Sequence, residues 1–190
     1  MAPKLKLGGI AAGIFILSSI AAYQYAQPAG TGWQEVAWPF PRDGWPPGRA
    51  FHCSLASCGD EIDLYVRPKL GFCNCDSGVA DDDEVDRVAD LDMISDRFVP
   101  REAGEVVHVA GIAGRKRQYD LRMPDGSQRL ALGIAASRRC DLMVAVALGS
   151  ALGKVAEFDL QKRVLEFLAS NPTASWMNAA LTGRKNGWSS

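Results

Sequence analysis

The fold is decided by the stretch LMVAVAL at positions 142–148, in which every residue is apolar. Side chains alternate between the two faces of a strand, so Leu142, Val144 and their even-numbered neighbours share one face. Met143 and the odd-numbered alanines then occupy the other face. A strand that is apolar on both faces is typical of the centre of a sheet. The sequence therefore predicts a sheet built outward from this strand.

Alternating patterns predict further strands before this one. Residues 49–53 and 61–67 form a predicted hairpin with a Gly59-Asp60 turn, and Pro68 ends the second strand. Residues 106–123 are predicted to form one long strand that bends at bulges near Gly111 and Gly114. The sequence Pro-Asp-Gly-Ser at 124–127 predicts a turn, after which residues 130–134 form the next strand.

Helices are expected in two places. Asp81 and Glu84 have the spacing of a capping box, which predicts a helix over residues 81–91. The apolar spacing within residues 159–170 predicts a second helix, ended by Asn171-Pro172, and a short segment follows over 175–181. The resulting order, ββαβββα with a mostly antiparallel sheet, is an α+β fold. This order is similar to that of small bacterial and photosynthetic accessory domains related to PsbP and Mog1, without a shared motif.

The N-terminal segment predicts attachment to a membrane. Residues 7–26 are uncharged and mostly apolar, which suits a transmembrane helix in contact with lipid. Lys4 and Lys6 precede this segment, so residues 1–6 are expected to form a cytoplasmic tip. The alternative is a cleaved signal peptide with Ser19-Ile-Ala21 at its cleavage site. The rest of the chain would lie in the bacterial periplasm, attached to the inner membrane by a single pass if the segment is retained.

A G-x-x-x-G motif lies within this predicted anchor. Small residues at this spacing let two membrane helices approach closely, so Gly9 and Gly13 could support a homodimer through the anchor. Flexible packing filler is the alternative reading of the same residues.

Residues 27–48 are rich in proline and glycine and are predicted to form a linker ahead of a folded domain at 49–190. A simple tether has no use for Trp33, Trp38, Phe40 and Trp45. These side chains are expected either to pack across their own domain as a strap or to contact a membrane-protein partner.

Four of the five cysteines cluster as C-x4-C-x14-C-x-C, at Cys53, Cys58, Cys73 and Cys75. In an oxidising periplasm they favour two disulfides that staple the first hairpin to the loop at 71–75. A bond between Cys73 and Cys75 would be strained, so Cys53 and Cys58 are each expected to bond one of them. Cys140 would then be a buried free thiol. The alternatives are a copper or zinc site at the same four residues or a redox-active dithiol, which the surrounding acids disfavour.

Charge is distributed unevenly along the chain, although its formal net value is only −1. That balance argues against a nucleic-acid partner. Basic residues concentrate in the second half, where Arg115, Lys116 and Arg117 could meet anionic headgroups or an acidic partner. The alternative is that the acidic first half neutralises them within the domain.

No catalytic signature is evident, and a hydrolase would have to use His52 or His108. The sequence therefore predicts a membrane-anchored periplasmic accessory, assembly or interaction protein of an envelope membrane complex, non-enzymatic and without a cofactor. The alternative is a periplasmic metal-handling (copper or zinc) or thiol-redox protein that uses the cysteine cluster.

Overall fold

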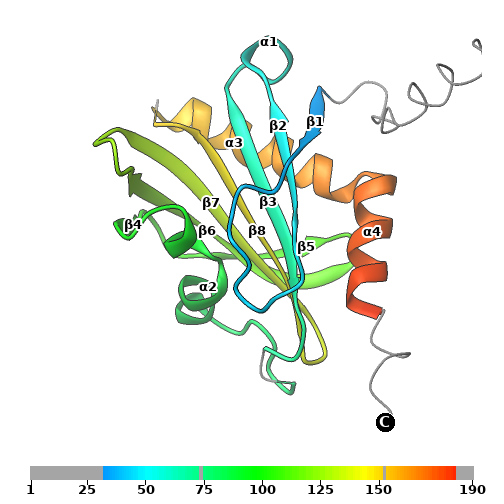
Figure 1. Cartoon of the computed structure of the whole chain (residues 1–190). Helices are drawn as coiled ribbons and strands as arrows, with labels where there is room; N and C mark the ends of the chain where they lie inside the picture. The colour runs from blue at the N-terminus through cyan, green and yellow to red at the C-terminus, as the bar shows by residue number, and fades with distance from the viewer. Residues whose placement is uncertain (1–31, 73–74, 152, 183–190) are drawn as a thin grey trace, which may run out of the picture.

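A computed structural model describes residues 32–72, 75–151 and 153–182. Within them, one antiparallel sheet runs in the order β1-β2-β3-β8-β7-β6-β4, with β5 also paired to β6 (Figure 1). The strands are β1 (Trp33–Val36), β2 (Arg49–Cys53), β3 (Ile62–Lys69), β4 (Phe98–Pro100), β5 (Glu105–Val109), β6 (Ile112–Arg122), β7 (Gln128–Arg138) and β8 (Asp141–Ser150). The helices are α1 (Leu55–Cys58), α2 (Asp82–Val88), the 3-10 helix η1 (Leu91–Met93), α3 (Gly153–Ala169) and α4 (Asn171–Thr182). The predicted α+β class and antiparallel sheet are confirmed.

The predicted central strand is β8. It pairs with β3 along one edge and with β7 along the other, so it has neighbours on both sides. Its even-numbered residues 142–148 enter one hydrophobic core, and the odd-numbered residues 143–147 enter the other. The hairpin of β2 and β3 is also confirmed, although its connection contains the single-turn helix α1.

The stretch predicted as one strand over 106–123 is two strands. β5 and β6 form a hairpin whose turn residues, Ala110 and Gly111, have φ values of 52° and 76°. Positive φ at both positions is what a two-residue type I′ turn requires, and asparagine usually fills the first of them. Ala110 is not a typical residue for the first position of this turn, so the alternating pattern over 106–123 shows no break there. Gly114, predicted to mark a bulge, occupies a paired strand position where a Cβ would collide with the carbonyl oxygen of Ala135.

Strand boundaries differ in three further places. β1 lies within the predicted linker, and the short strand β4 was not expected; both are at sheet edges, where nearby prolines are tolerated. β3 continues past Pro68 to Lys69. β2 begins at Arg49, opposite Val66, so the part of β3 beyond Val66 has a paired strand on one side only, which is where a strand accommodates proline.

Helix boundaries differ as well. The Asp81 cap is confirmed, since its carboxylate accepts a hydrogen bond from the Glu84 amide at 2.9 Å, but α2 ends at Val88. α3 begins at Gly153, before the predicted start at Asp159. α4 begins at Asn171 and is longer than predicted, because a proline in the first turn of a helix leaves no backbone hydrogen bond unmade.

The sheet is covered on both faces (Figure 1). One face packs against α3 and α4 through a core that joins the helix residues Leu160, Val164, Phe167, Leu168, Met177 and Leu181 to the strands. The other face packs against α2 and η1 through a core that includes Val85, Val88, Leu91, Tyr119 and Leu121. The strap, defined here as residues 37–48, crosses this second face between β1 and β2. The domain is therefore a three-layer arrangement.

The membrane prediction falls on residues that the structure does not describe. Residues 1–31, which include the segment 7–26 with Gly9 and Gly13, lie outside the described residues. Among the helices that are described, none has the length and apolar character needed to cross a bilayer. β1, which begins at Trp33 within the predicted linker, pairs with β2 and so belongs to the sheet.

Candidate functional site

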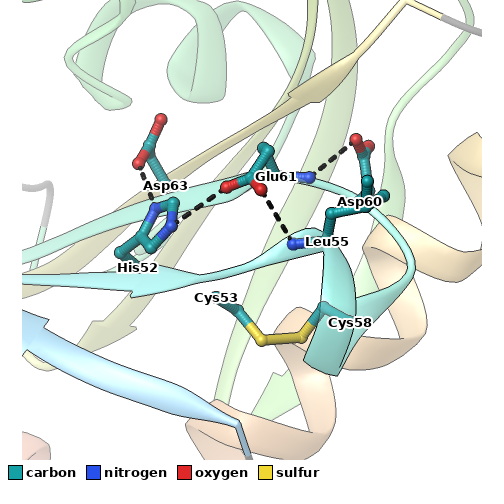
Figure 2. The surroundings of a disulfide bond; sticks show 7 residues. All are labelled: His52, Cys53, Leu55, Cys58, Asp60, Glu61 and Asp63. Atoms are coloured by element: carbon teal, nitrogen blue, oxygen red, sulfur yellow. Dashed lines mark hydrogen bonds and ion pairs between the residues drawn. A yellow bond between two sulfur atoms is a disulfide. The ribbon is translucent and has the colours of Figure 1, made fainter.

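The cysteine region at the tip of β2 and β3 is built around a local disulfide (Figure 2). Cys53 ends β2 and Cys58 ends α1, and their sulfur atoms are bonded with a Cα–Cα distance of 5.9 Å. The turn of helix closes at Gly59, whose left-handed φ of 74° lets its amide donate to the Leu55 carbonyl at 2.8 Å. This single turn carries the chain back over Cys53. Both cysteines are buried, so the bond is enclosed by the core.

A second disulfide joins distant parts of the chain. Cys75, in the loop before α2, is bonded to Cys140, in the turn between β7 and β8. The predicted pairing of Cys53 and Cys58 with the 73–75 loop is therefore wrong, and so is the prediction that Cys140 is a free thiol. Cys73 lies outside the described residues. The sequence spacing could not show the correct pairing, because it depends on the α1 turn and on the place where the β7–β8 hairpin ends.

These bonds bear on the alternative reading, a copper or zinc site. Cys53 and Cys58 are bonded to each other and Cys75 to Cys140, so in this oxidised form their thiolates are not free as metal ligands. Over residues 32–72, 75–151 and 153–182, no group of three or more histidine, cysteine, aspartate or glutamate side chains is arranged to hold a metal ion.

His52 lies beside the first disulfide, between two carboxylates (Figure 2). Its Nδ1 is 2.9 Å from Asp63 Oδ1, and its Nε2 is 3.0 Å from Glu61 Oε2. In a hydrolase triad one ring nitrogen faces an acid and the other faces a nucleophile. Here both nitrogens face acids, and the nearby Ser150 hydroxyl instead bonds Asp60. The residues form a cluster of polar side chains in contact with one another and not a nucleophilic site.

Two acids just before β3, Asp60 and Glu61, hold the β2–β3 connection in place. Glu61 accepts a hydrogen bond from the Leu55 amide at 2.9 Å, which satisfies an unpaired donor at the start of α1. Asp60 accepts from the Ser150 amide at 2.8 Å and so ties the connection to the end of β8. Their contacts are those of structural residues.

The basic run at 115–117 is paired within the domain. Arg115 contacts Asp82 at 2.5 Å, Arg117 contacts Asp86 at 2.7 Å, and Lys116 contacts Glu105. The two arginines thus pair with acidic residues of α2. This agrees with the alternative that the acidic first half neutralises the basic residues within the domain. The Gly104 amide and the Arg115 guanidinium both hold the pKa of the Asp82 carboxyl below its usual value.

Tyr119 is part of the same layer. Its hydroxyl donates a hydrogen bond to Asp86 at 2.6 Å, and burial together with that carboxylate raises the pKa of the phenol strongly. A tyrosine held in its neutral form in this way is a hydrogen-bond donor that orients α2 on β6.

The aromatic residues predicted as a strap or a partner surface pack on their own domain. Trp33 is buried and stacks on Phe167 of α3, with ring centroids 4.8 Å apart. Trp38 and Phe40 lie edge-on to Tyr65 of β3. Trp45 lies edge-on to Phe72. These rings therefore lie across their own domain, as in the strap interpretation. Trp38, Phe40 and Trp45 remain partly exposed.

Sequence reasoning missed the buried ion cluster beneath the strap. Arg67, whose side chain is 4% exposed, contacts Asp43 of the strap at 2.6 Å and Asp90 at 2.6 Å. Lys69 contacts the same Asp90 at 2.5 Å. Two cations at alternate positions of the strand at 62–69, on the same face and next to apolar residues, are the signal that could have revealed it, because buried cations need acidic partners.

Comparison with known proteins places no family on this chain: no family model and no curated protein matches it. Three solved structures share part of its chain path. PA94 of Pseudomonas aeruginosa, a protein of unknown function, is 14% identical over 74% of this chain and 84% of its own, with a TM-score of 0.40. LpqN, involved in cell envelope biogenesis of Mycobacterium tuberculosis, is 12% identical over 70% and 73%, with a TM-score of 0.41. Cyanobacterial PsbP of Synechocystis is 17% identical over 73% and 79%, with a TM-score of 0.42.

Proposed function

We propose that this chain is an extracytoplasmic accessory or assembly protein of a bacterial envelope membrane complex, held at the inner membrane by residues 7–26, and that it acts by binding a membrane-protein partner without catalysis or a resident metal. One observation carries this proposal: the reactive groups of the candidate site are bonded to one another. The described cysteines form disulfides, and His52 is enclosed by two acids.

The disulfides support the extracytoplasmic part of the proposal. Structural disulfides form and persist in oxidising compartments and are rare in the cytoplasm. The Cys75–Cys140 bond closes a separation of 65 residues, so it restrains the unfolded chain more than the local Cys53–Cys58 bond does. The proposed anchor and its two N-terminal lysines agree with this orientation.

The surface chemistry supports binding over catalysis. The polar clusters of the domain hold α1, α2 and the strap in place through the hydrogen bonds and ion pairs of Glu61, Asp82 and Asp43. What the domain offers outward is a set of isolated exposed apolar side chains, namely Val36, Leu55, Val99, Val106 and Phe158.

Purification of the full chain in mild detergent tests the proposal. A stoichiometric partner should co-purify with it, and should be lost when residues 32–182 are replaced by an unrelated folded domain on the same anchor. Recovery of the chain alone, or of the same protein with both baits, would contradict the proposal. The alternative, metal handling or thiol redox at the cysteine cluster, instead requires free thiols and bound copper or zinc in the purified protein.

A further inference from the structure

The two edges of the sheet are unequal. On one side the sheet ends at β1, and on the other β4 and β5 both pair with β6. β5 has the sequence EVVHV, in which Val106 is 67% exposed and His108 is also exposed. Native edge strands usually carry proline, lysine or a bulge that prevents pairing with another chain. β4 ends at Pro100 and β1 is followed by Pro39, whereas β5 carries none of these features.

The hairpin geometry shows which backbone groups of β5 point away from β6. Val109 and Ile112 flank a two-residue turn and therefore exchange hydrogen bonds with each other. Hydrogen-bonded pairs alternate along an antiparallel ladder, so Val107 and Glu105 also face β6. The N–H and C=O groups of Val106 and His108 consequently point outward, and no hydrogen bond reaches them from the residues that the structure describes.

We propose that β5 is a self-association edge, at which β5 of a second copy of this chain adds as an antiparallel strand across a two-fold axis. In this arrangement Val106 of each copy lies opposite His108 of the other, and Val107 lies opposite itself. Both outward-facing residues of each strand then exchange hydrogen bonds, and the two sheets become continuous. The inference does not depend on the partner proposed above.

The structure selects this register over its neighbours. A shift of two residues in one direction would pair His108 with Gly104, whose amide already donates to Asp82 Oδ2 at 2.8 Å. A shift in the other direction would pair Val106 with Ala110, which lies in the turn with positive φ. In the selected register Glu105 lies opposite Val109 of the other copy, so like charges do not meet across the axis.

Further contact area lies beside the start of the strand. A groove of about 250 Å³ runs between β6 and α3, next to Glu105 and Lys116, and the exposed Phe158 ring lines it. The β5–β6 turn of the second copy would approach this end of β5, since its Ala110 follows the residue opposite Glu105. Pairing of five-residue strands buries less surface than a permanent dimer, so we expect weak association that the membrane anchor strengthens by raising the effective concentration.

Sedimentation of the full chain in detergent, over a range of protein concentrations, tests the association. Wild-type protein should form a concentration-dependent dimer. His108→Pro and Val106→Pro each remove an outward N–H and leave the β5–β6 ladder bonds in place, so each should shift the protein to monomer. Glu35→Pro at the β1 edge, where the alternation of the ladder also leaves the N–H pointing away from β2, is the matched control and should leave the dimer intact. A wild-type monomer at every concentration overturns the proposal, as does a dimer that survives both β5 prolines.

Cross-linking tests the register even if a proline variant is unstable. Val106→Cys and His108→Cys chains, each in a Cys73→Ser background, are oxidised alone and as a mixture. Residues 106 and 108 of different copies lie within disulfide reach only in the proposed register, so the mixture should cross-link more than either chain alone. Equal cross-linking in all three samples overturns the register. Gly9→Leu/Gly13→Leu tests whether the dimer forms through the predicted membrane helix instead. If this variant abolishes the dimer, the interface belongs to that helix and the β5 interface is contradicted.

Discussion

The two faces of the sheet are covered in different ways. The face under α3 and α4 is closed by apolar side chains, with Phe167 in contact with both Trp33 and Phe51. The opposite face is closed by α2 and the strap, and there ion pairs bridge the layers at Asp43, Asp82 and Asp86. Apolar contacts follow a periodic pattern in the sequence, whereas ion pairs join residues with no fixed spacing. The difference explains why the apolar contacts could be predicted from the sequence and the ion pairs could not.

The largest loss of stability is expected on the apolar face, under α3 and α4. Phe167→Ala should lower the free energy of unfolding by about 3–5 kcal/mol, because it removes a large side chain between two aromatic neighbours and leaves a cavity. Chemical denaturation measures the change. Phe158→Ala, an exposed position on the same helix, is the matched control and should change stability little. Equal effects at both positions would contradict the packing described here.

On the ion-paired face the largest effect is expected at Arg67. Arg67→Met removes the ion pairs of Arg67 with Asp43 and Asp90, and leaves Asp90 paired with Lys69 alone. The free energy of unfolding should therefore fall by about 3 kcal/mol. Hydrogen exchange should increase selectively within the strap. Arg101→Met, which breaks an exposed pair with Asp120, should cost less than about 1 kcal/mol.

A second variant separates the ion cluster from simple packing. Arg67→Met/Asp43→Asn removes the carboxylate that Arg67→Met leaves unpaired and keeps the Lys69–Asp90 pair, so it should recover part of the stability that Arg67→Met loses. If the double variant loses more stability than the two single variants lose together, the cluster does not act through charge.

The local disulfide should contribute less than either buried cluster. Cys53→Ala/Cys58→Ala opens a bond that closes a separation of only 5 residues, and the loss expected from chain entropy is about 2 kcal/mol. Thermal unfolding with the Cys75–Cys140 bond intact measures it. The fold should persist, because Ile62, Leu64 and the rest of the apolar core are untouched; global unfolding of this variant would mean that the bond does more than fasten α1.

The smallest expected effect is a pH dependence at α2. The pKa of Asp82 is lowered in the folded protein, so this carboxylate stabilises the fold above its ordinary titration range and loses that contribution as the pH falls through its folded pKa. Below about pH 4 the stability of the wild type should fall more steeply than that of Asp82→Asn. The difference should be at most about 1 kcal/mol, because the pair is partly exposed. Parallel pH profiles would contradict the role of Asp82.

The success of sequence reasoning followed the same division. The central strand, the β2–β3 hairpin and the Asp81 cap each depend on neighbours within a few residues, and all three were predicted. The β5–β6 turn was missed because Ala110 takes a conformation that its side chain disfavours. Arg67, Asp43 and Asp90 were missed because their meeting depends on the path of the strap across the sheet.

The cysteines show the same limit at the candidate site. Composition and compartment predicted disulfides, and disulfides are present. Their pairing was wrong because spacing alone does not reveal that one turn of helix brings Cys58 over Cys53, or that Cys140 lies beside Cys75.

Four of the five cysteines, Cys53, Cys58, Cys75 and Cys140, form two disulfides, and we propose that these bonds are structural parts of an extracytoplasmic domain and serve neither metal binding nor redox chemistry. Intact mass spectrometry of alkylated protein, with and without reductant, followed by peptide mapping, tests it most directly. We predict four fewer alkylatable thiols without reductant than with it, and linked peptides that contain Cys53 with Cys58 and Cys75 with Cys140. Free thiols at these four positions with bound copper or zinc would contradict the claim.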